Sequence, residues 1–302
     1  MTHIHEEERV FSLSRTFARA LGRLGCHPPS LIKQQFVDAV ITGDTVIAGK
    51  ILQRHSGASL LHALGDDGID HTLFELTLGE GNFAMADVMI NRWPQILAHD
   101  FGYEGAPGNR TILMQRCIMS DGGDEIQFLI DRKADVNAKD AKGDTPLHFA
   151  ARLQKDRTAK LLLGAQPDVN AANNEGVTPV MDATKGNESV MLDAIVAAGG
   201  DVHAVDKKGL NAAMHAIYNS NLPATRRLME LGAKIDFSDP AVATLCRVAT
   251  HEGDIPFVIA LGEYEHKVNN EKASFDYAGT LDKGLAEGIT VARPLKLKGR
   301  AP

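Results

Sequence analysis

The chain has 302 residues, of which 44% are hydrophobic and only 5% aromatic, and its formal net charge is −7. This composition is typical of a folded protein with a core of small and aliphatic side chains, and the acidic balance argues against a nucleic-acid partner. Three scattered cysteines exclude a disulfide framework and a zinc pattern, so no metal or cofactor is expected. No apolar run approaches the about 20 residues of a membrane span, and the acidic N-terminus is unlike a signal peptide, which predicts a cytoplasmic protein.

The first 30 residues predict one helix. Apolar residues recur at near-helical spacing between Val10 and Leu24, and the stretch ends at Gly25 and the sequence HPPS. We expect residues 1–30 to form an N-terminal capping helix.

Two helix pairs with looser spacing are predicted next. The segments 36–52 and 72–90 each place a glycine, Gly43 and Gly81, between two helical runs. Residues 97–110 contain several glycines and a proline, which indicates a long loop rather than a helix.

A regular period is clearest around the sequence GDTPLHFAA at Gly143–Ala151. Thr-Pro predicts a helix start, because a hydroxyl can cap free backbone N–H groups and proline fits the first helical position. Counterparts of Thr145, and of the alanine five places on, recur every 33 residues: Thr178, Asn211 and Thr244, and Ala150, Ala183, Ala216 and Ala249. The period predicts stacked helix pairs, with the alanines at close helix contacts.

A unit of this length that contains Thr-Pro-Leu-His-Phe-Ala, Thr145–Ala150, resembles the ankyrin repeat. The resemblance is strong over residues 111–237, weaker upstream, and extends to a terminal capping repeat at 244–264. It implies an all-α solenoid of about seven helix–turn–helix repeats over residues 31–267, with short hairpin fingers. It also implies that His148 is structural and forms hydrogen bonds near the helix start.

The period is lost from residue 268. Residues 268–302 are expected to form a non-repeat tail, and the part from Gly288 onward contains four basic residues and no acidic one: Arg293, Lys296, Lys298 and Arg300.

Stacked helix pairs enclose no small substrate and offer a broad groove, and in proteins that resemble ankyrins its occupant is usually a protein. We therefore expect a monomeric protein–protein interaction module. We expect it not to be an enzyme, because the sequence lacks the G-x-S-x-G, P-loop, H-E-x-x-H and G-x-G-x-x-G motifs. One alternative is a bacterial effector exported into a host cell, with the basic tail as export signal and a host protein as target. Another is a purely structural, self-assembling solenoid.

The period also assigns the binding residues. Two rows on the concave helix face, and polar side chains on the fingers at 137–144, 170–177 and 203–210, are expected to be exposed and to contact the partner. The first row is Phe149, Asp182 and His215, the second is Arg152, Lys185 and Tyr218, and the finger residues are Lys139, Lys142, Asn174 and Lys207. Aromatic residues and arginine are enriched at binding hot spots, which favours this assignment.

Overall fold

The computed structural model describes residues 31–269, apart from 55–73, 76, 101–107, 120, 122 and 187–189. The expected N-terminal capping helix and nearly all of the expected tail lie outside the described residues. The described part is mostly helical and contains no strand, only one isolated antiparallel bridge between Val205 and Asn211. The all-α prediction is confirmed. None of the described helices is long and apolar enough to cross a lipid bilayer.

The chain divides into two compact units, Met1–Asp135 and Val136–Pro302. The labelled elements of the first unit are α2 (Leu31–Thr42), α3 (Thr45–Arg54), α6 (Phe83–Arg92), the 3-10 helix η1 (Pro94–Ala98), α7 (Ile112–Met119) and α8 (Gly123–Asp131). Helix α2 packs on α3, α3 on α6, and α7 on both η1 and α8. Gly43 and Gly81 lie in helix-to-helix turns with φ of 71° and 70°, as the sequence indicated, because this left-handed conformation favours glycine.

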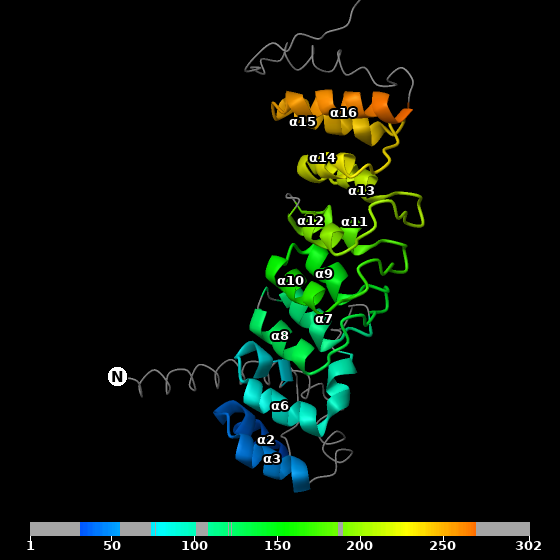
Figure 1. Ribbon diagram of the computed structural model, residues 1–302. Helices are drawn as coiled ribbons and strands as arrows, with labels where there is room; N and C mark the ends of the chain where they lie inside the picture. The colour runs from blue at the N-terminus through cyan, green and yellow to red at the C-terminus, as the bar shows by residue number, and fades with distance from the viewer. Residues whose placement is uncertain are drawn as a thin grey trace, which may run out of the picture. The chain divides into compact units, whose positions relative to one another are not determined.

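The second unit is a stack of helix pairs (Figure 1). Its helices are α9 (Pro146–Arg152), α10 (Asp156–Gly164), α11 (Pro179–Ala183), α12 (Val190–Ala197), α13 (Ala212–Tyr218), α14 (Leu222–Glu230), α15 (Pro240–His251) and α16 (Ile255–Asn269). The first helix of each pair packs on the first helix of the next, so that α9, α11, α13 and α15 form one layer. We call these four the inner helices and their partners the outer helices. The count of about seven repeats stays a prediction.

The alanines of the period lie where the inner helices meet. The side chains at all four positions, Ala150, Ala183, Ala216 and Ala249, are fully buried. Alanine adds little bulk, so neighbouring inner helices approach closely, while Leu162, Ile195 and Leu228 fill the space behind them with fully buried aliphatic groups.

One predicted helix start is wrong. Helix α15 begins at Pro240, where the Asp239 carboxylate accepts a hydrogen bond from the Ala241 amide at 2.8 Å. Thr244 therefore lies inside the helix and is exposed. The sequence Asp-Pro supplies a cap and a first-position proline five residues before the place that the period indicates. The packing register is unchanged, since Ala249 remains buried.

Candidate binding surface

Each inner helix of the second unit begins at a cap, and the cap of α9 uses His148. As the sequence predicted, the Thr145 side chain takes part in the cap: it forms a capping box with His148, and its hydroxyl also lies 2.9 Å from Nδ1 of that residue. The same ring nitrogen accepts the Thr145 amide hydrogen at 3.1 Å, and Nε2 lies 3.0 Å from the Val177 carbonyl oxygen of the next repeat. A carbonyl only accepts, so Nε2 carries the proton and the ring is neutral. His148 is buried and joins two repeats.

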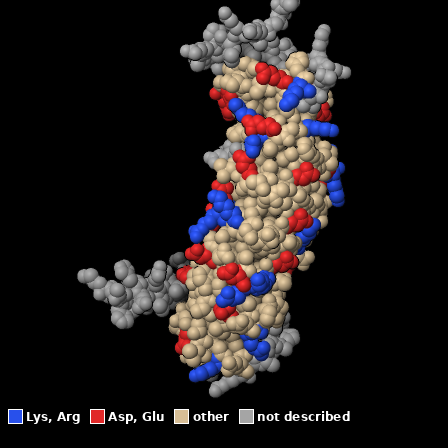
Figure 2. Space-filling view, viewed as in Figure 1, with Lys and Arg blue, Asp and Glu red and all other residues tan. Residues whose placement is uncertain are grey.

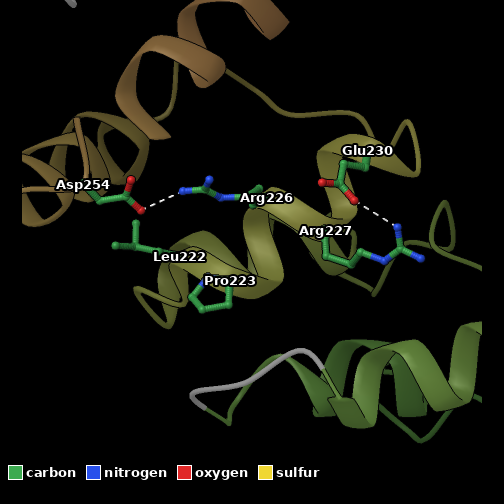
Figure 3. Close-up of a pocket in the computed structure, with 6 residues that line it drawn as sticks. All are labelled: Leu222, Pro223, Arg226, Arg227, Glu230 and Asp254. Carbon is green, nitrogen blue, oxygen red and sulfur yellow. Dashed lines mark hydrogen bonds and ion pairs between the residues drawn. The ribbon is translucent and has the colours of Figure 1, made fainter. Parts of the chain in front are cut away.

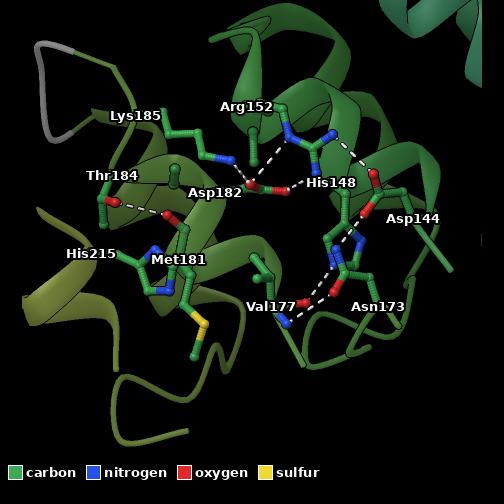
Figure 4. Close-up of polar contacts among 12 residues, drawn as sticks. Asp144, His148, Arg152, Asn173, Val177, Met181, Asp182, Thr184, Lys185 and His215 are labelled. Carbon is green, nitrogen blue, oxygen red and sulfur yellow. Dashed lines mark hydrogen bonds and ion pairs between the residues drawn. The ribbon is translucent and has the colours of Figure 1, made fainter. Parts of the chain in front are cut away.

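Arg152, at the end of α9, is the centre of an ion-pair network between α9 and α11 (Figure 4). Its guanidinium donates to Asp144 at 2.9 Å and forms two hydrogen bonds with Asp182, at 3.2 and 2.7 Å. Lys185 donates to the same Asp182 carboxylate at 2.7 Å, and Asn173 donates to Asp144 at 2.7 Å. The two carboxylates are buried, with side chains 2% and 0% exposed, so each buried negative charge has a cationic partner.

Burial and the contacts of the network shift the pKa values of Asp144, Arg152 and the adjacent His148. Burial alone would raise the pKa of Asp144, but hydrogen bonds from Arg152 and Asn173 outweigh it and lower the pKa below its ordinary value. Burial disfavours the charged form of Arg152, yet the hydrogen bonds and charges of the two carboxylates raise its pKa. Burial is the main reason that the pKa of His148 is lowered. Asp144 and Arg152 are therefore charged and the adjacent ring is neutral near pH 7.

Asp144, His148 and Asp182 offer ligand atoms within 4.8 Å of one another, a grouping that could suggest a metal site. Both ring nitrogens of His148 are already engaged, with Thr145 and with the Val177 carbonyl. The carboxylates face the guanidinium of Arg152, which occupies the place of a cation (Figure 4). The geometry is that of a structural ion-pair network rather than a metal centre.

The expectation that all ten assigned residues are exposed is wrong for two of them. Phe149 is 5% exposed and Asp182 is 0% exposed. The Arg152 guanidinium lies over the Phe149 ring, 5.8 Å from its centroid, and Asp182 lies between Arg152 and Lys185. Arg152 itself is half-buried, with 29% of its side chain exposed. The contact between Phe149 and Arg152 lies within α9, whereas Asp182 is bound by Arg152 of the preceding repeat, a contact that the period of one repeat does not contain.

His215 is partly buried as well. Its Nε2 lies 3.0 Å from the Asp206 carboxylate, at the base of the third finger. The other expected contact residues are exposed: Lys185 and Tyr218 on inner helices, and Lys139, Lys142, Asn174 and Lys207 on the fingers.

Tyr218, at the end of α13, is 53% exposed. Its hydroxyl donates to the Asp239 carboxylate at 2.6 Å, and this interaction is the main reason that the pKa of Tyr218 is raised. Asp239 caps α15, so the ring is held against the following repeat. His251, 33 residues further on at the end of α15, is exposed too. Sequence reasoning missed it, although the period alone would have found it. We call Arg152, Lys185, Tyr218 and His251 the inner-helix row.

The three fingers share one turn design. In each, a side-chain oxygen accepts two backbone N–H groups two and four residues on, at Asp140, Asn173 and Asp206. Backbone hydrogen bonds join neighbouring fingers, from the Asn174 amide to the Lys142 carbonyl at 2.8 Å and from the Lys207 amide to the Glu175 carbonyl at 2.9 Å. The finger tips therefore form one continuous edge.

An open groove of about 420 Å³ lies on the outer side of the second unit, along α14 (Figure 3). Two arginines line it and each has an acidic partner. Arg226 contacts Asp254 at 2.7 Å, and Arg227 contacts Asp193 at 2.6 Å and Glu230 at 2.9 Å. The groove is lined by two basic and two acidic residues, so its charges balance, and none of the ten assigned binding residues lines it.

Comparison with known proteins agrees with this geometry. A family model described as ankyrin repeats (three copies) matches residues 80–173, 113–192 and 153–239. Together these matches cover residues 80–239, which is 160 of the 302 residues. No curated protein sequence matches the chain.

Proposed function

Because the chain belongs to the ankyrin-repeat family, whose repeats generally act as protein–protein interaction modules, we propose that this chain binds a partner protein and catalyses no reaction of its own. The partner contacts the inner-helix row and the fingers of the second unit, and the chain acts as a monomer. Such a module works by tethering its partner or by blocking the partner's access to other molecules.

The observation that supports this proposal is the fixed geometry of the inner-helix row. Arg152 is held by Asp182 on the next inner helix, Lys185 is held by the same carboxylate, and Tyr218 is held by Asp239. Side chains that are already fixed lose little conformational entropy on binding, which favours affinity. Tyrosine and arginine are also enriched among residues that dominate binding energy.

The row contains one side chain suited to be the main anchor. Tyr218 combines an exposed ring with an anchored hydroxyl, whereas Arg152 is committed to two buried carboxylates. A test of binding should therefore change Tyr218 and the exposed Lys185 and leave Arg152 intact, because loss of Arg152 would disturb the fold.

The experiment is affinity purification from cells that naturally make the protein, followed by mass spectrometry, with three forms of the full chain. These are the wild type, the double variant Lys185→Ala/Tyr218→Ala, and the control Val190→Ala, which removes an exposed apolar side chain from an outer helix. We expect a specific protein to be retained by the wild type and the control and lost by the double variant. Titration calorimetry with that protein should then show at least about ten-fold weaker binding to the double variant. Equal binding by all three forms would contradict the proposed surface.

A further inference from the structure

On the finger edge, most acidic side chains are buried and the lysine side chains are exposed. Asp140 and Asp206 are 5% and 8% exposed, and their carboxylates accept backbone N–H groups within their own turns. Asp206 also contacts His215. The carboxylates of Asp140 and Asp206 are thus buried in their own turns, and Asp144 of the first finger is buried against Arg152.

The lysines of the same fingers lie at the surface. Lys139, Lys142, Lys207 and Lys208 are all exposed. Lys139 donates to the Ala172 carbonyl of the neighbouring finger at 3.0 Å, but the ammonium groups of the other three form no ion pair with any described residue. Glu175, on the middle finger, is the one exposed acidic side chain within the three finger segments. The tips therefore expose more positive than negative charge on a chain with a net charge of −7.

We propose that the finger edge of the second unit binds an acidic polypeptide segment, whose carboxylates contact Lys142, Lys207 and Lys208. This inference rests on the proposed function and names the chemistry of the partner. Opposite charges across an interface give specificity and speed association. The backbone hydrogen bonds between fingers fix the spacing of the lysines, so that an extended segment crossing the tips meets them in succession.

A second row of charges favours a polypeptide over a nucleic acid. Asp168 and Asp201 are exposed just before the second and third fingers. In Figure 2, basic side chains project along the edge of the second unit where the finger loops lie in Figure 1, and acidic side chains form a row beside them. A nucleic acid carries negative charge at every phosphate and would be repelled by that row. A polypeptide can place single carboxylates on the lysines and other side chains on the aspartates.

The test is fluorescence anisotropy with the full chain and a labelled peptide of alternating glutamate and serine. About 12 residues suffice, because an extended chain of that length spans about 40 Å. A peptide of alternating glutamine and serine and a single-stranded oligothymidine serve as comparison probes. The variants are the triple reversal Lys142→Glu/Lys207→Glu/Lys208→Glu and a control with the same change in net charge, Lys50→Glu/Lys160→Glu/Lys267→Glu, at exposed helix positions. Circular dichroism checks that each variant is folded.

We expect the glutamate peptide to bind the wild type, and the finger reversal to weaken its affinity by at least about ten-fold at low salt, with about two-fold loss or less in the control. Glu175→Lys should strengthen binding about three-fold. The inference is overturned if the glutamate peptide does not bind, if both triple variants lose affinity equally, if the glutamine peptide binds as well, or if oligothymidine binds more tightly.

Failure of this inference can be distinguished from failure of the proposed function by testing a captured partner protein against both sets of variants. If a captured partner protein depends on Lys185 and Tyr218 but is unaffected by the finger reversal, the proposed function holds and this inference fails. If the partner is lost with the finger reversal alone, the inference holds and the inner-helix row is not the contact surface.

Discussion

The guanidinium of Arg152 holds the fully buried carboxylate of Asp182 by two hydrogen bonds, from Nε to Oδ1 at 3.2 Å and from Nη2 to Oδ2 at 2.7 Å. The two residues are 30 positions apart and belong to successive inner helices. Asp182 was expected to contact a partner protein, but it instead links two successive repeats through Arg152. These two residues therefore stabilise the stack of helices, and other side chains are available for binding.

Arg152→Ala should destabilise the protein by about 3 kcal/mol, because it leaves the buried carboxylates of Asp144 and Asp182 without their main partner. Urea denaturation followed by circular dichroism measures the change. Lys185→Ala is the matched control and should cost less than about 1 kcal/mol, since its amine is partly exposed and Arg152 still pairs with Asp182. Similar losses in the two variants would show that Arg152 is not the principal partner.

Stability should decrease as the pH falls from 7 to 5, because of His148. Its pKa is lowered from the ordinary 6.5, so the unfolded chain binds this proton more readily than the folded protein does. The contribution of the neutral His148 ring to the free energy of unfolding is therefore full above about pH 6.5 and is lost progressively below it. Urea titrations at several pH values should show a smaller decrease for His148→Gln, whose amide can still donate to Val177. His203→Gln, at an exposed finger histidine, should keep the wild-type dependence.

Gly176→Ala should destabilise the protein more than Gly209→Ala. Both glycines have φ of 81°, so alanine is strained equally at each, by about 1 kcal/mol. A Cβ at Gly176 would lie 2.9 Å from the Lys207 nitrogen and 3.1 Å from the Asp206 Cα, whereas Gly209 has open space. We expect a further about 1–3 kcal/mol at Gly176 from displacing the neighbouring finger. Equal urea midpoints for the two variants would contradict the close contact between fingers.

Gln166→Gly should stabilise the protein by about 0.5–1 kcal/mol. Gln166 follows α10 with φ of 56°, and the equivalent residues of the next two repeats are glycines with φ of 98° and 79°, Gly199 and Gly232. The exposed glutamine side chain is strained in this left-handed conformation, whereas glycine adopts it readily. Thermal unfolding should show a higher midpoint for the glycine variant and no gain for Gln166→Ala, which keeps the strain.

The repeat could be predicted from the sequence because its determinants are local. Thr145 and Pro146 mark a helix start, Gly81 marks a turn, and Ala150 and Ala183 mark close contacts, each by a conformational or steric preference that acts within a few residues. Even the helix start wrongly predicted at Thr244 has a local reason, since Asp239 and Pro240 offer an equally good cap five residues earlier.

The candidate surface was predictable only in part, because the period does not show which side chains on a face are covered by their neighbours. Lys142 and Lys207 on the fingers are exposed as expected, whereas Phe149 and Asp182 are buried, and Arg152 lies over one and binds the other. The period determined on which face of a helix each residue lies. Only the tertiary structure decided which polar side chains on that face remain available, because a charged group buried between repeats is stable only when a partner about 30 residues away compensates for its lost hydration.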